Sequence, residues 1–508
     1  MTATTDRVDA DVAIVGCGPV GSTLAILLAQ HGHRVVVLER WPEPYPLPRA
    51  VHFDHEIGRI FQSAGIGPAL REISEAAEVY EWRNATGTTL LRLGQQGDGP
   101  SGWPYASMFN QPALEALLDR RAAQLPMIDV RRGVEIDGLT QHVDSVTVSA
   151  VDGTAVTARV VVGCDGANST VRRLVDLGVH DLGFFFDWLI VDVVLDEHRV
   201  FDPLNLQVCD PARPTTAVSG GPGRRRWEFM RLPTETLAEL NEEQRAWELL
   251  AAWDVQPANA RLERHAVYTF NARYAERWRD GRVMLAGDAA HQMPPFAGQG
   301  MCAGIRDAAN LAWKLDLVLT GRAPDSLLDT YQLERLPSAR RAIEFSMQLG
   351  NVICVPDPIA AAARDEAMAG AVGDEPAITP ELPGVDSGIV DASSPHAGRL
   401  FVQGEIDGRP FDDIHGAGWR LITIDPDTDL DGDLVAWFGS IGGRVVPIAA
   451  PGHVHRVWFA DHHCGWALQR PDFHLFGTAT DRNTAARLLT ELRRQIAHPD
   501  PALQRTPT

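Results

Sequence analysis

The chain has 508 residues, of which 46 are basic and 67 acidic, giving a formal net charge of −21. Its 45% hydrophobic and 22% charged residues are typical of a folded globular protein, and its length fits about three domains of ~150 residues each. The acidic excess argues against a nucleic-acid or anionic-membrane partner, because both bind basic surfaces. The six cysteines are scattered without a CxxC pair, which fits neither a zinc site nor a disulfide framework and favours a reducing cytoplasm.

The N-terminal region is expected to contain neither a signal peptide nor a membrane span. Residues 1–11, MTATTDRVDAD, include acids where a signal peptide needs cations followed by an apolar run. Residues 12–30 are uncharged, but three glycines and a proline near the start of this segment indicate a strand, a tight turn and a helix. The sequence therefore predicts a cytoplasmic protein without a transmembrane segment.

The first motif, GCGPVG, lies between a predicted strand at 9–15 and a predicted helix that stops at Gly32. In such a motif Gly16 makes the turn, Gly18 lets the backbone approach a pyrophosphate, and Gly21 allows close packing of helix against strand. The context of strand before and helix after makes the motif stronger than a lone glycine pattern.

The residues around this motif complete a predicted dinucleotide site. Pro19 and Val20 begin the helix, whose unpaired N–H groups attract phosphate. A second strand, RVVVLER, contains Glu39, an acceptor for the hydroxyls of an adenosine ribose. This βαβ unit alone does not separate FAD from NAD.

The rest of the chain divides by its hydrophobic pattern. The elements predicted next are a helix at 111–124, strands around 128–136, 145–150 and 155–163, an antiparallel sheet between about 176 and 275, a strand at 282–288, and helices at about 299–319 and 325–350. The Ala-, Pro- and Asp-rich stretch 356–384 is predicted as a linker. The remaining segment alternates short strands (WRLITI, RVVPIAA, HRVWFA, WALQRPD) with a last helix at 479–497.

Two further motifs place a strand before a glycine–aspartate pair. VVVGCDGANS runs into Asp165 and Gly166, and RVMLAGDAAH runs into Gly287 and Asp288. Together with GCGPVG, in this order and at these separations, they resemble the class A flavoprotein aromatic hydroxylases. The segments PRAVHFDHEIGRIFQ, RRRWEFM and the run from VYTFNARYAERW to DAANLAWKL are similar to the 3-(3-hydroxyphenyl)propionate hydroxylase branch.

The resemblance extends from about residue 9 to residue 350 and implies an α/β fold. Its Rossmann-like, glutathione reductase-type FAD-binding domain would carry an inserted, mostly antiparallel substrate-binding sheet, and the tail resembles the family's thioredoxin-like C-terminal domain. The implied division is 1–75, 105–175 and 276–355 for the FAD-binding domain, 76–104 and 176–275 for the substrate-binding domain, 356–384 for the linker, and 385–508 for the C-terminal domain. No separate nicotinamide domain is implied.

The resemblance also implies the FAD contacts. Besides the first motif, these are Glu39 and Arg40 at the adenosine, Arg49 and Gln111 at the phosphate and ribityl portion, Asp165 at the nicotinamide or as a helix cap, Gly287 and Asp288 at a ribityl hydroxyl, Pro295 near the ring, and Gly298, Gly300 and Met301 along its pyrimidine edge. A helix that starts near Gly300 would point its positive end at the flavin and stabilise the reduced ring. Many relatives have Asn where this chain has Cys302, so no side-chain contact is implied there.

The catalytic residues are less well defined. Activation of a phenol requires a group that accepts its proton or hydrogen bond. His52 and Asp54 follow Arg49 on a segment that the resemblance places close to the flavin, and Tyr268 is a further candidate. His55 lies on the same segment as His52 and Asp54, Tyr105 is a competing candidate beside Tyr268, and the proton can also leave through water.

Other polar residues are expected to be structural. His291 is predicted as a satisfied loop histidine and Cys17 as a small packing residue. The arginines of 224–231 are predicted as a solvated strand end in preference to an anion clamp.

The sequence thus predicts an FAD-dependent monooxygenase that consumes NADH or NADPH and O2. It would hydroxylate a small phenolic substrate through a flavin C4a-hydroperoxide, as a monomer or homodimer without a metal. Epoxidation or Baeyer–Villiger oxygenation of a polyketide-like substrate, and a flavin-binding protein that does not oxygenate, remain alternatives. A thioredoxin-type redox role for the tail is not expected, because Cys464 has no CxxC partner.

Overall fold

The computed structural model describes residues 8–369, 377, 384–448 and 454–500. Its first sheet is built around parallel strands in the order β18-β11-β1-β2-β8. These strands are β1 (Ala10–Val15), β2 (Val35–Glu39), β8 (Ile128–Arg132), β11 (Ala155–Gly163) and β18 (Val283–Leu285), with β9 (Ile136–Gln141), β10 (Val146–Ala150) and β17 (Arg279–Asp280) added antiparallel. Their β-branched residues are buried because helices cover the sheet.

Two predicted strands of this sheet end earlier than the sequence pattern suggested. The strand at 128–136 is divided, because Gly133 adopts a positive φ of 76° between β8 and β9. The strand at 282–288 stops at Leu285, and Gly287, with φ 62°, begins the short 3-10 turn η1 (Gly287–Ala289). That turn directs Asp288 away from the sheet.

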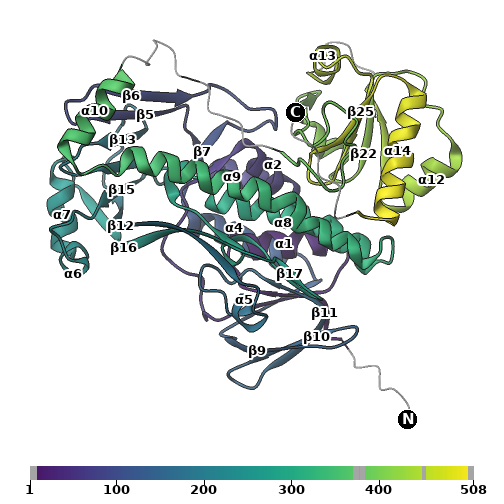
Figure 1. The fold of residues 1–508 in the computed structure, drawn as a ribbon, viewed down its shortest axis with the longest axis horizontal. Helices are drawn as coiled ribbons and strands as arrows, with labels where there is room; N and C mark the ends of the chain where they lie inside the picture. The colour runs from purple at the N-terminus through teal and green to yellow at the C-terminus, as the bar shows by residue number, and fades with distance from the viewer. Residues whose placement is uncertain (1–7, 370–376, 378–383, 449–453, 501–508) are drawn as a thin grey trace.

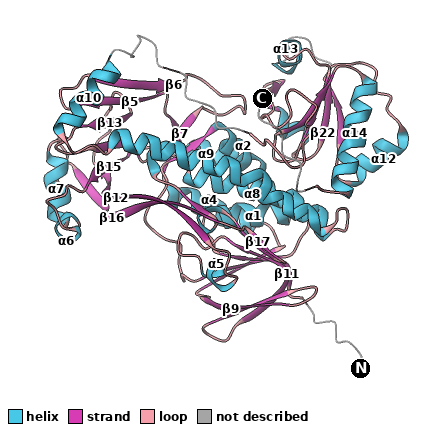
Figure 2. Cartoon of the chain, in the orientation of Figure 1, coloured by secondary structure: helices cyan, strands magenta, loops and turns pink. Residues whose placement is uncertain are grey.

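Helices α1 (Pro19–Gln30), α8 (Gly300–Leu319) and α9 (Asp329–Ile353) contribute buried residues to the hydrophobic core that this sheet forms. Helix α1 contacts α4 (Gln111–Ala123) and α8, and α8 contacts α9. Figure 2 shows α8 and α9 crossing the middle of the molecule. The smaller helical elements of this part are α2 (His55–Ser63), α3 (Gly67–Glu72), α5 (Thr170–Leu174), η2 (Pro295–Ala297) and η3 (Asp325–Leu328).

The second sheet has the strand order β19-β16-β12-β15-β14-β13-β5-β6 and is antiparallel except between β13 and β5. Its strands are β5 (Val79–Asn84), β6 (Thr89–Gly94), β12 (Val179–Leu195), β13 (Asn205–Cys209), β14 (Thr215–Ser219), β15 (Arg224–Met230), β16 (Ala260–Ala275) and β19 (His291–Gln292). Helices α6 (Leu237–Leu240) and α7 (Glu243–Ala251) cover one end (Figure 1). A small sheet of β3 (His52–Asp54), β7 (Ala106–Phe109) and β4 (Ser74–Ala76) completes this half of the molecule.

Part of the predicted linker is a helix. Helix α10 (Pro358–Ala369) contacts β6, and its N-terminus is capped by Asp357, which accepts a hydrogen bond from the Ala360 N–H at 2.8 Å. Arg364 fastens it by donating to the Cys209 carbonyl at 2.6 Å. The alanine-rich sequence has high helix propensity, which outweighs the flanking prolines that suggested a linker. The remainder of that prediction falls largely on 370–376 and 378–383, outside the described residues.

The C-terminal lobe, residues 384–500 in their described part, has its own sheet with the order β23-β22-β24-β25. Its elements are β20 (Glu405–Ile406), β21 (Arg409–Pro410), α11 (Phe411–His415), β22 (Arg420–Thr423), α12 (Gly432–Ser440), β23 (Arg444–Pro447), α13 (Val454–Asp461), β24 (Trp466–Gln469), β25 (Leu475–Ala479) and α14 (Arg482–Ala497). The strand predicted for HRVWFA is wrong: this segment lies in α13, because His455 and Phe459, four residues apart, are its buried residues.

Buried ion pairs join this lobe to the rest of the protein. Lys314 on α8 lies 2.8 Å from Glu334 on α9, and Arg470 of the lobe donates to the same Glu334 at 2.6 Å. Burial lowers the pKa of Lys314 to about 8. On the other side of the lobe, Arg59 of α2 pairs with Asp412 at 2.6 Å. The lobe therefore has a fixed position against α2, α8 and α9.

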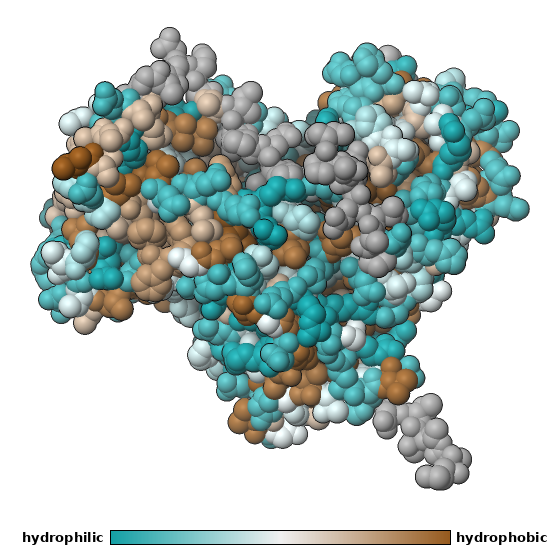
Figure 3. Space-filling model, in the orientation of Figure 1, coloured by the Kyte–Doolittle hydropathy of each residue, from teal (hydrophilic) through white to brown (hydrophobic). Residues whose placement is uncertain are grey.

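The surface agrees with the acidic, polar composition. Hydrophilic residues cover most of the C-terminal lobe, and apolar residues are more frequent on the side of the second sheet (Figure 3). None of the helices in the described part of the chain combines the length and apolar character needed to cross a bilayer.

Candidate functional site

A single large cavity brings most of the predicted site residues together. Its volume is about 2740 Å³, well above the ~300–1,000 Å³ of a pocket for one small ligand. It is bordered by the β1–α1 turn, the 49–55 segment, the turns before α8 and one face of the second sheet. The cavity therefore has room for a dinucleotide and a second molecule beside it.

The β1–α1 turn has the geometry that the glycine motif predicts. Gly16 has a φ of 106°, and a Cβ there would lie 2.4 Å from the Cys164 carbonyl oxygen. A Cβ on Gly21 would lie 2.1 Å from the Gly16 carbonyl, so both glycines are required by packing. A Cβ on Gly18 would meet nothing within 4 Å, because this residue faces the cavity. Gly18 is also the N-cap of α1 without a side-chain cap, which leaves N–H groups for a ligand.

The end of β2 and the following loop contribute charged groups. Glu39 accepts hydrogen bonds from the backbone of Cys17 at 2.8 Å and of Trp41 at 3.0 Å, so its carboxylate stabilises the turn. Arg40 and Arg49 border the cavity, and neither guanidinium forms an ion pair within the described residues. Arg49 instead lies over the Tyr45 ring at 4.5 Å. Both cations are therefore available to an anion.

Gln111 fixes the segment that carries Arg49. Its Oε1 accepts from the backbone N–H groups of Arg49 at 3.1 Å and Ala50 at 2.6 Å, while its Nε2 donates to Glu115. Gln111 borders the cavity, but its amide is used mainly to hold this backbone.

The two glycine–aspartate motifs differ in how their carboxylates are used. Asp165 accepts from Ser169 Oγ at 2.5 Å and from the Thr170 N–H at 2.7 Å, so it stabilises the start of α5. The Asp288 side chain is exposed to the cavity and accepts no hydrogen bond from the described residues. Although the carboxyl faces the cavity, the protein around it excludes much of the bulk water, and this desolvation raises its pKa. Asp288 is thus a free acceptor.

A buried network behind Asp288 was not predicted. His291 lies 2.6 Å from Asp307, as expected for a structural histidine, and Asp307 also accepts from the Gly287 N–H at 3.0 Å and from Arg335 at 2.9 Å. Although burial opposes it, the neighbouring His291 and Arg335 hold the pKa of Asp307 below its ordinary value. Asp307 therefore positions the turn from which Asp288 projects.

The turn before α8 meets His52. Gly298 has a φ of 65° after Pro295–Ala297, and a Cβ there would lie 2.8 Å from His52 Nδ1. The Nδ1–H of His52 donates to the Gly298 carbonyl at 3.1 Å, which leaves Nε2 unprotonated. Burial lowers the pKa of His52, so the ring is neutral. Helix α8 starts at Gly300 without a side-chain cap, and Gly300 and Met301 border the cavity.

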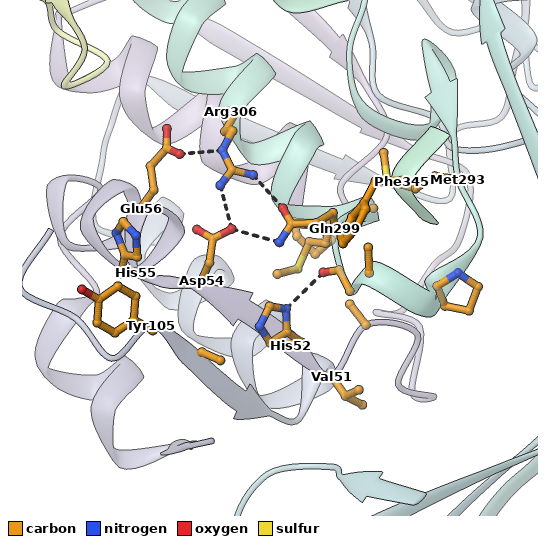
Figure 4. A pocket seen from close by; sticks show the side chains of 18 of the residues that line it. Val51, His52, Asp54, His55, Glu56, Tyr105, Met293, Gln299, Arg306 and Phe345 are labelled. Atoms are coloured by element: carbon orange, nitrogen blue, oxygen red, sulfur yellow. Dashed lines mark hydrogen bonds and ion pairs between the residues drawn. The ribbon is translucent and has the colours of Figure 1, made fainter. Parts of the chain in front are cut away.

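Arg306 connects these elements, and it too was missed from the sequence. Its guanidinium donates to Asp54 at 2.6 Å, to Glu56 at 2.6 Å and to Gln299 at 3.0 Å (Figure 4). Asp54 also caps α2 through the Ile57 N–H at 3.2 Å. Although burial opposes it, the Arg306 cation holds the pKa of Asp54 far below its ordinary range. Asp54 is thereby a positioning group and a poor proton acceptor.

Tyr268 faces the cavity from β16. The Arg264 guanidinium lies over its ring at 4.5 Å, and burial raises the pKa of the phenol, so Tyr268 stays protonated. The other two candidates, His55 and Tyr105, pack edge to face with ring centroids 5.5 Å apart, close to Asp54 and Glu56 (Figure 4).

Of the arginines of 224–231, predicted as a solvated strand end, Arg224 and Arg231 are partly exposed, with 38% and 30% of their side chains accessible, but the two between them contradict the prediction. Arg225 and Arg226 are buried, and Arg226 pairs with Asp192 at 2.7 Å and donates to the Arg49 carbonyl at 2.6 Å. The prediction failed because the strand lies inside the molecule, where the 48–49 backbone supplies acceptors. Arg226 therefore supports the loop of Arg49.

The donor set fits FAD. Gly18 offers an open backbone at a helix N-terminus for a pyrophosphate, Arg49 an unpaired cation, and Asp288 a free carboxylate for a sugar-like hydroxyl. These features define a class of proteins that bind a dinucleotide carrying a polyhydroxyl chain. The chain matches the family described as FAD binding domain over residues 9–346, and it belongs to that family.

Relatives with named activities cover nearly the whole chain. It is 40% identical to a "Probable NADH-specific resorcinol 4-hydroxylase" of Rhodococcus jostii (strain RHA1), over 98% of this chain and 97% of that protein. It is 36% identical to a "3-(3-hydroxy-phenyl)propionate/3-hydroxycinnamic acid hydroxylase" of Mycobacterium sp. (strain JLS), over 88% and 82%. Among solved structures, anhydrotetracycline hydroxylase from Streptomyces rimosus superposes with a TM-score of 0.72 at 27% identity, covering 97% of this chain and 100% of the other. The class of FAD-dependent aromatic hydroxylases is thereby shown.

Proposed function

We propose that this protein hydroxylates a small phenol at the expense of NADH and O2. The observation that carries the proposal is the cavity, in which a site fit for FAD adjoins a space lined by one face of the second sheet. The names of the two relatives support a phenolic substrate, and the first of them supports NADH as the reductant. The chemistry supplied by bound FAD is hydride acceptance and the activation of O2 for transfer of one oxygen atom.

The residues predicted from the sequence would hold the cofactor. We assign the pyrophosphate to the α1 N-terminus at Gly18, with Arg49 as its counter-charge, and the adenosine to Glu39 and Arg40. Asp288 would accept a hydrogen bond from a ribityl hydroxyl. The start of α8, from Gly298 to Met301, would present backbone N–H groups and its positive end to the flavin ring.

The protein's own contribution to the reaction is orientation, proton acceptance and exclusion of water. The neutral His52 ring carries no proton on Nε2 and borders the cavity, so it can accept a hydrogen bond from the phenolic hydroxyl. Tyr268 stays protonated and would donate a hydrogen bond from the facing wall. The apolar side chains of Phe270, Met293 and Phe296 would surround the ring and exclude water.

We further propose the domain division implied by the sequence. The parallel sheet with α1 and α8 supports a Rossmann-like FAD-binding domain, and strands β5, β6 and β12–β16 support an inserted substrate-binding domain. In the C-terminal lobe, β22 is parallel to β23 and antiparallel to β24, which is antiparallel to β25, an arrangement that supports a thioredoxin-like fold.

The test is oxidation of NADH by the FAD-loaded protein with and without resorcinol, phenol and 3-(3-hydroxyphenyl)propionate, under ¹⁸O2. We expect at least one phenol to stimulate NADH oxidation and to yield a product with one labelled hydroxyl. Hydrogen peroxide is quantified in parallel to separate hydroxylation from uncoupled oxidation. The proposal is wrong if no phenol is hydroxylated. This holds whether a ketone or polycyclic quinone is oxygenated instead or no compound is oxygenated at all.

A further inference from the structure

The wall of the second sheet contains a carboxylate, that of Glu228, to which no residue of the described part of the chain donates a hydrogen bond. Glu228 lies opposite Ile190 on β12 and Thr216 on β14, and all three border the cavity. Its side chain is buried, with the residue 7% exposed. Within the described residues the carboxylate accepts no hydrogen bond, and its ion pair with Arg226 measures 3.8 Å.

The neighbouring donors are already used elsewhere. Arg226 donates to both oxygens of Asp192, at 2.7 and 3.0 Å, and to the backbone carbonyls of residues 48 and 49. Thr216 Oγ1 donates to Gln207 Oε1 at 2.7 Å, and the Tyr80 hydroxyl donates to the same oxygen at 3.3 Å. Arg264, the other cation facing Glu228, donates through its Nη1 to the Pro48 carbonyl, and its buried Nε has no hydrogen-bond partner in the described residues. No donor of the described wall therefore reaches the Glu228 carboxylate.

A buried carboxylate without a donor is costly, and here the cavity is the direction from which a donor can come. Burial raises the pKa of Glu228 against the opposing cations Arg226 and Arg264. The apolar Ile190, its cross-strand neighbour on β12, borders the cavity beside it. This combination fits a flat apolar ring that brings one hydroxyl.

We propose that the Glu228 carboxylate accepts a hydrogen bond from a ring hydroxyl of the phenolic substrate and disfavours a substrate that brings its own carboxylate to this wall. The inference rests on the proposed function and deepens it, because it names a residue that selects among phenols. A hydrogen bond from the ring hydroxyl to the charged carboxylate increases the affinity for a phenol. Repulsion between two carboxylates lowers the affinity for a substrate that places its own carboxylate here.

The test compares Glu228→Gln and Glu228→Leu with the parent protein. Titration of the FAD-loaded proteins by calorimetry, without NADH, gives Kd for resorcinol and for 3-(3-hydroxyphenyl)propionate. We expect Glu228→Leu to raise the Kd for resorcinol about 10-fold or more, since a hydrogen bond to a charged group is lost. Glu228→Gln keeps an acceptor but removes the charge, so we expect the preference for resorcinol over the propionate to fall about 10-fold.

Glu81→Gln is the matched control, because Glu81 is equally buried at 7% on the same sheet but pairs with Arg83 and does not border the cavity. We expect it to leave both Kd values and their ratio unchanged. FAD affinity and the ratio of KM to kcat are measured for every variant, because a merely structural role for Glu228 would alter cofactor binding or kcat and not substrate preference.

The outcomes separate the two proposals. If the parent hydroxylates phenols and the Glu228 variants retain its Kd ratio, or Glu81→Gln changes the ratio equally, the role of Glu228 is refuted and the function stands. If the parent hydroxylates no phenol and binds neither compound, the proposed function fails and the role of Glu228 fails with it.

Discussion

Replacing Arg306 by Met would remove the cation that ties α2 to the start of α8. The carboxylates of Asp54 and Glu56, only 14% and 10% exposed, would both lose their counter-ion. Loss of one partner of a buried ion pair costs about 3–5 kcal/mol. Asp54 would still accept hydrogen bonds from the Ile57 N–H and from Gln299. The expected loss in the free energy of unfolding is therefore at the lower end, about 3 kcal/mol. Since 1 kcal/mol shifts Tm by about 2–4 °C for a domain of about 150–250 residues and by less for a larger cooperative unit, Tm is expected to fall by up to roughly 6–12 °C.

The loss depends on pH with a defined sign. In the parent, Arg306 holds the pKa of Asp54 below its ordinary value of 3.8, so the stabilisation is present above that value and is lost as the pH falls through the lowered pKa. In the variant, the buried carboxylate lacks a cation and its pKa rises above the ordinary value. Protonation of this carboxylate as the pH falls then removes the free-energy cost of burying an unpaired charge. The Tm gap between parent and variant is therefore expected to narrow from pH 8 to pH 5.

Scanning calorimetry of the FAD-loaded proteins at pH 5 and pH 8 measures both effects. Arg131→Met is the control, because Arg131 is 38% exposed and pairs with the exposed Asp129, a contact worth ~0–1 kcal/mol. Adding Asp54→Asn and Glu56→Gln to Arg306→Met removes the unpaired charges and should restore most of the Tm. Equal Tm values for the Arg306 and Arg131 variants, or a gap that does not change with pH, would refute the reasoning.

Three further predictions concern the cofactor and the C-terminal lobe. Asp288→Asn is expected to weaken FAD binding about 10-fold or more, because a charge-assisted hydrogen bond is lost; flavin fluorescence titration measures it, and an unchanged Kd would contradict the assignment. Gly18→Ala should keep the Tm of the FAD-free protein but weaken FAD binding, since its Cβ enters open space, whereas Gly21→Ala should lower that Tm, since its Cβ would lie 2.1 Å from the Gly16 carbonyl. Thermal melts and FAD titrations of both variants decide this, and indistinguishable variants would contradict it. Cys464→Ser should leave NADH-coupled turnover unchanged, because burial raises the pKa of this lone thiol of the lobe to about 11; a loss of turnover at unchanged Tm would reveal a redox role.

The βαβ unit could be predicted because its signals are local. The β-branched strand, the glycine turn and the acid at the next strand end each act within a few residues, and the close contacts of Gly16 and Gly21 explain why only glycine fits. The errors arose where local signals compete. In α10 the helix propensity of alanine outweighs nearby prolines, and in α13 a short apolar run has the spacing of either a strand or a helix.

Site residues that belong to a local sequence motif could be predicted. Site residues that interact across a long stretch of the chain could not. Asp288 follows a recognisable strand end, whereas Arg306 pairs with Asp54 across 252 positions of the chain and with Glu56 across 250. On α8 alone, Arg306 looks like any charged residue of a helix. Glu228 likewise stands in a strand whose neighbouring arginines suggested solvent, and only the assembled sheet reveals which charges are satisfied.

Most charged groups around the cavity have partners within the protein. The few charged groups without a described partner therefore indicate what the ligand must supply. In an acidic protein of net charge −21, most of the buried cations around the cavity, such as Arg226 and Arg306, are neutralised by carboxylates or carbonyls. The exposed Arg49 forms no ion pair with the residues that the structure describes, and an anion such as a pyrophosphate would supply one. Asp288 and Glu228 are the reverse case, because each is a carboxylate to which no described residue donates a hydrogen bond, although cations such as Arg226 lie near Glu228. One anionic cofactor with a hydroxyl chain and one neutral phenol would satisfy all three groups, whereas a substrate that brings its carboxylate to this wall would leave Glu228 without a donor.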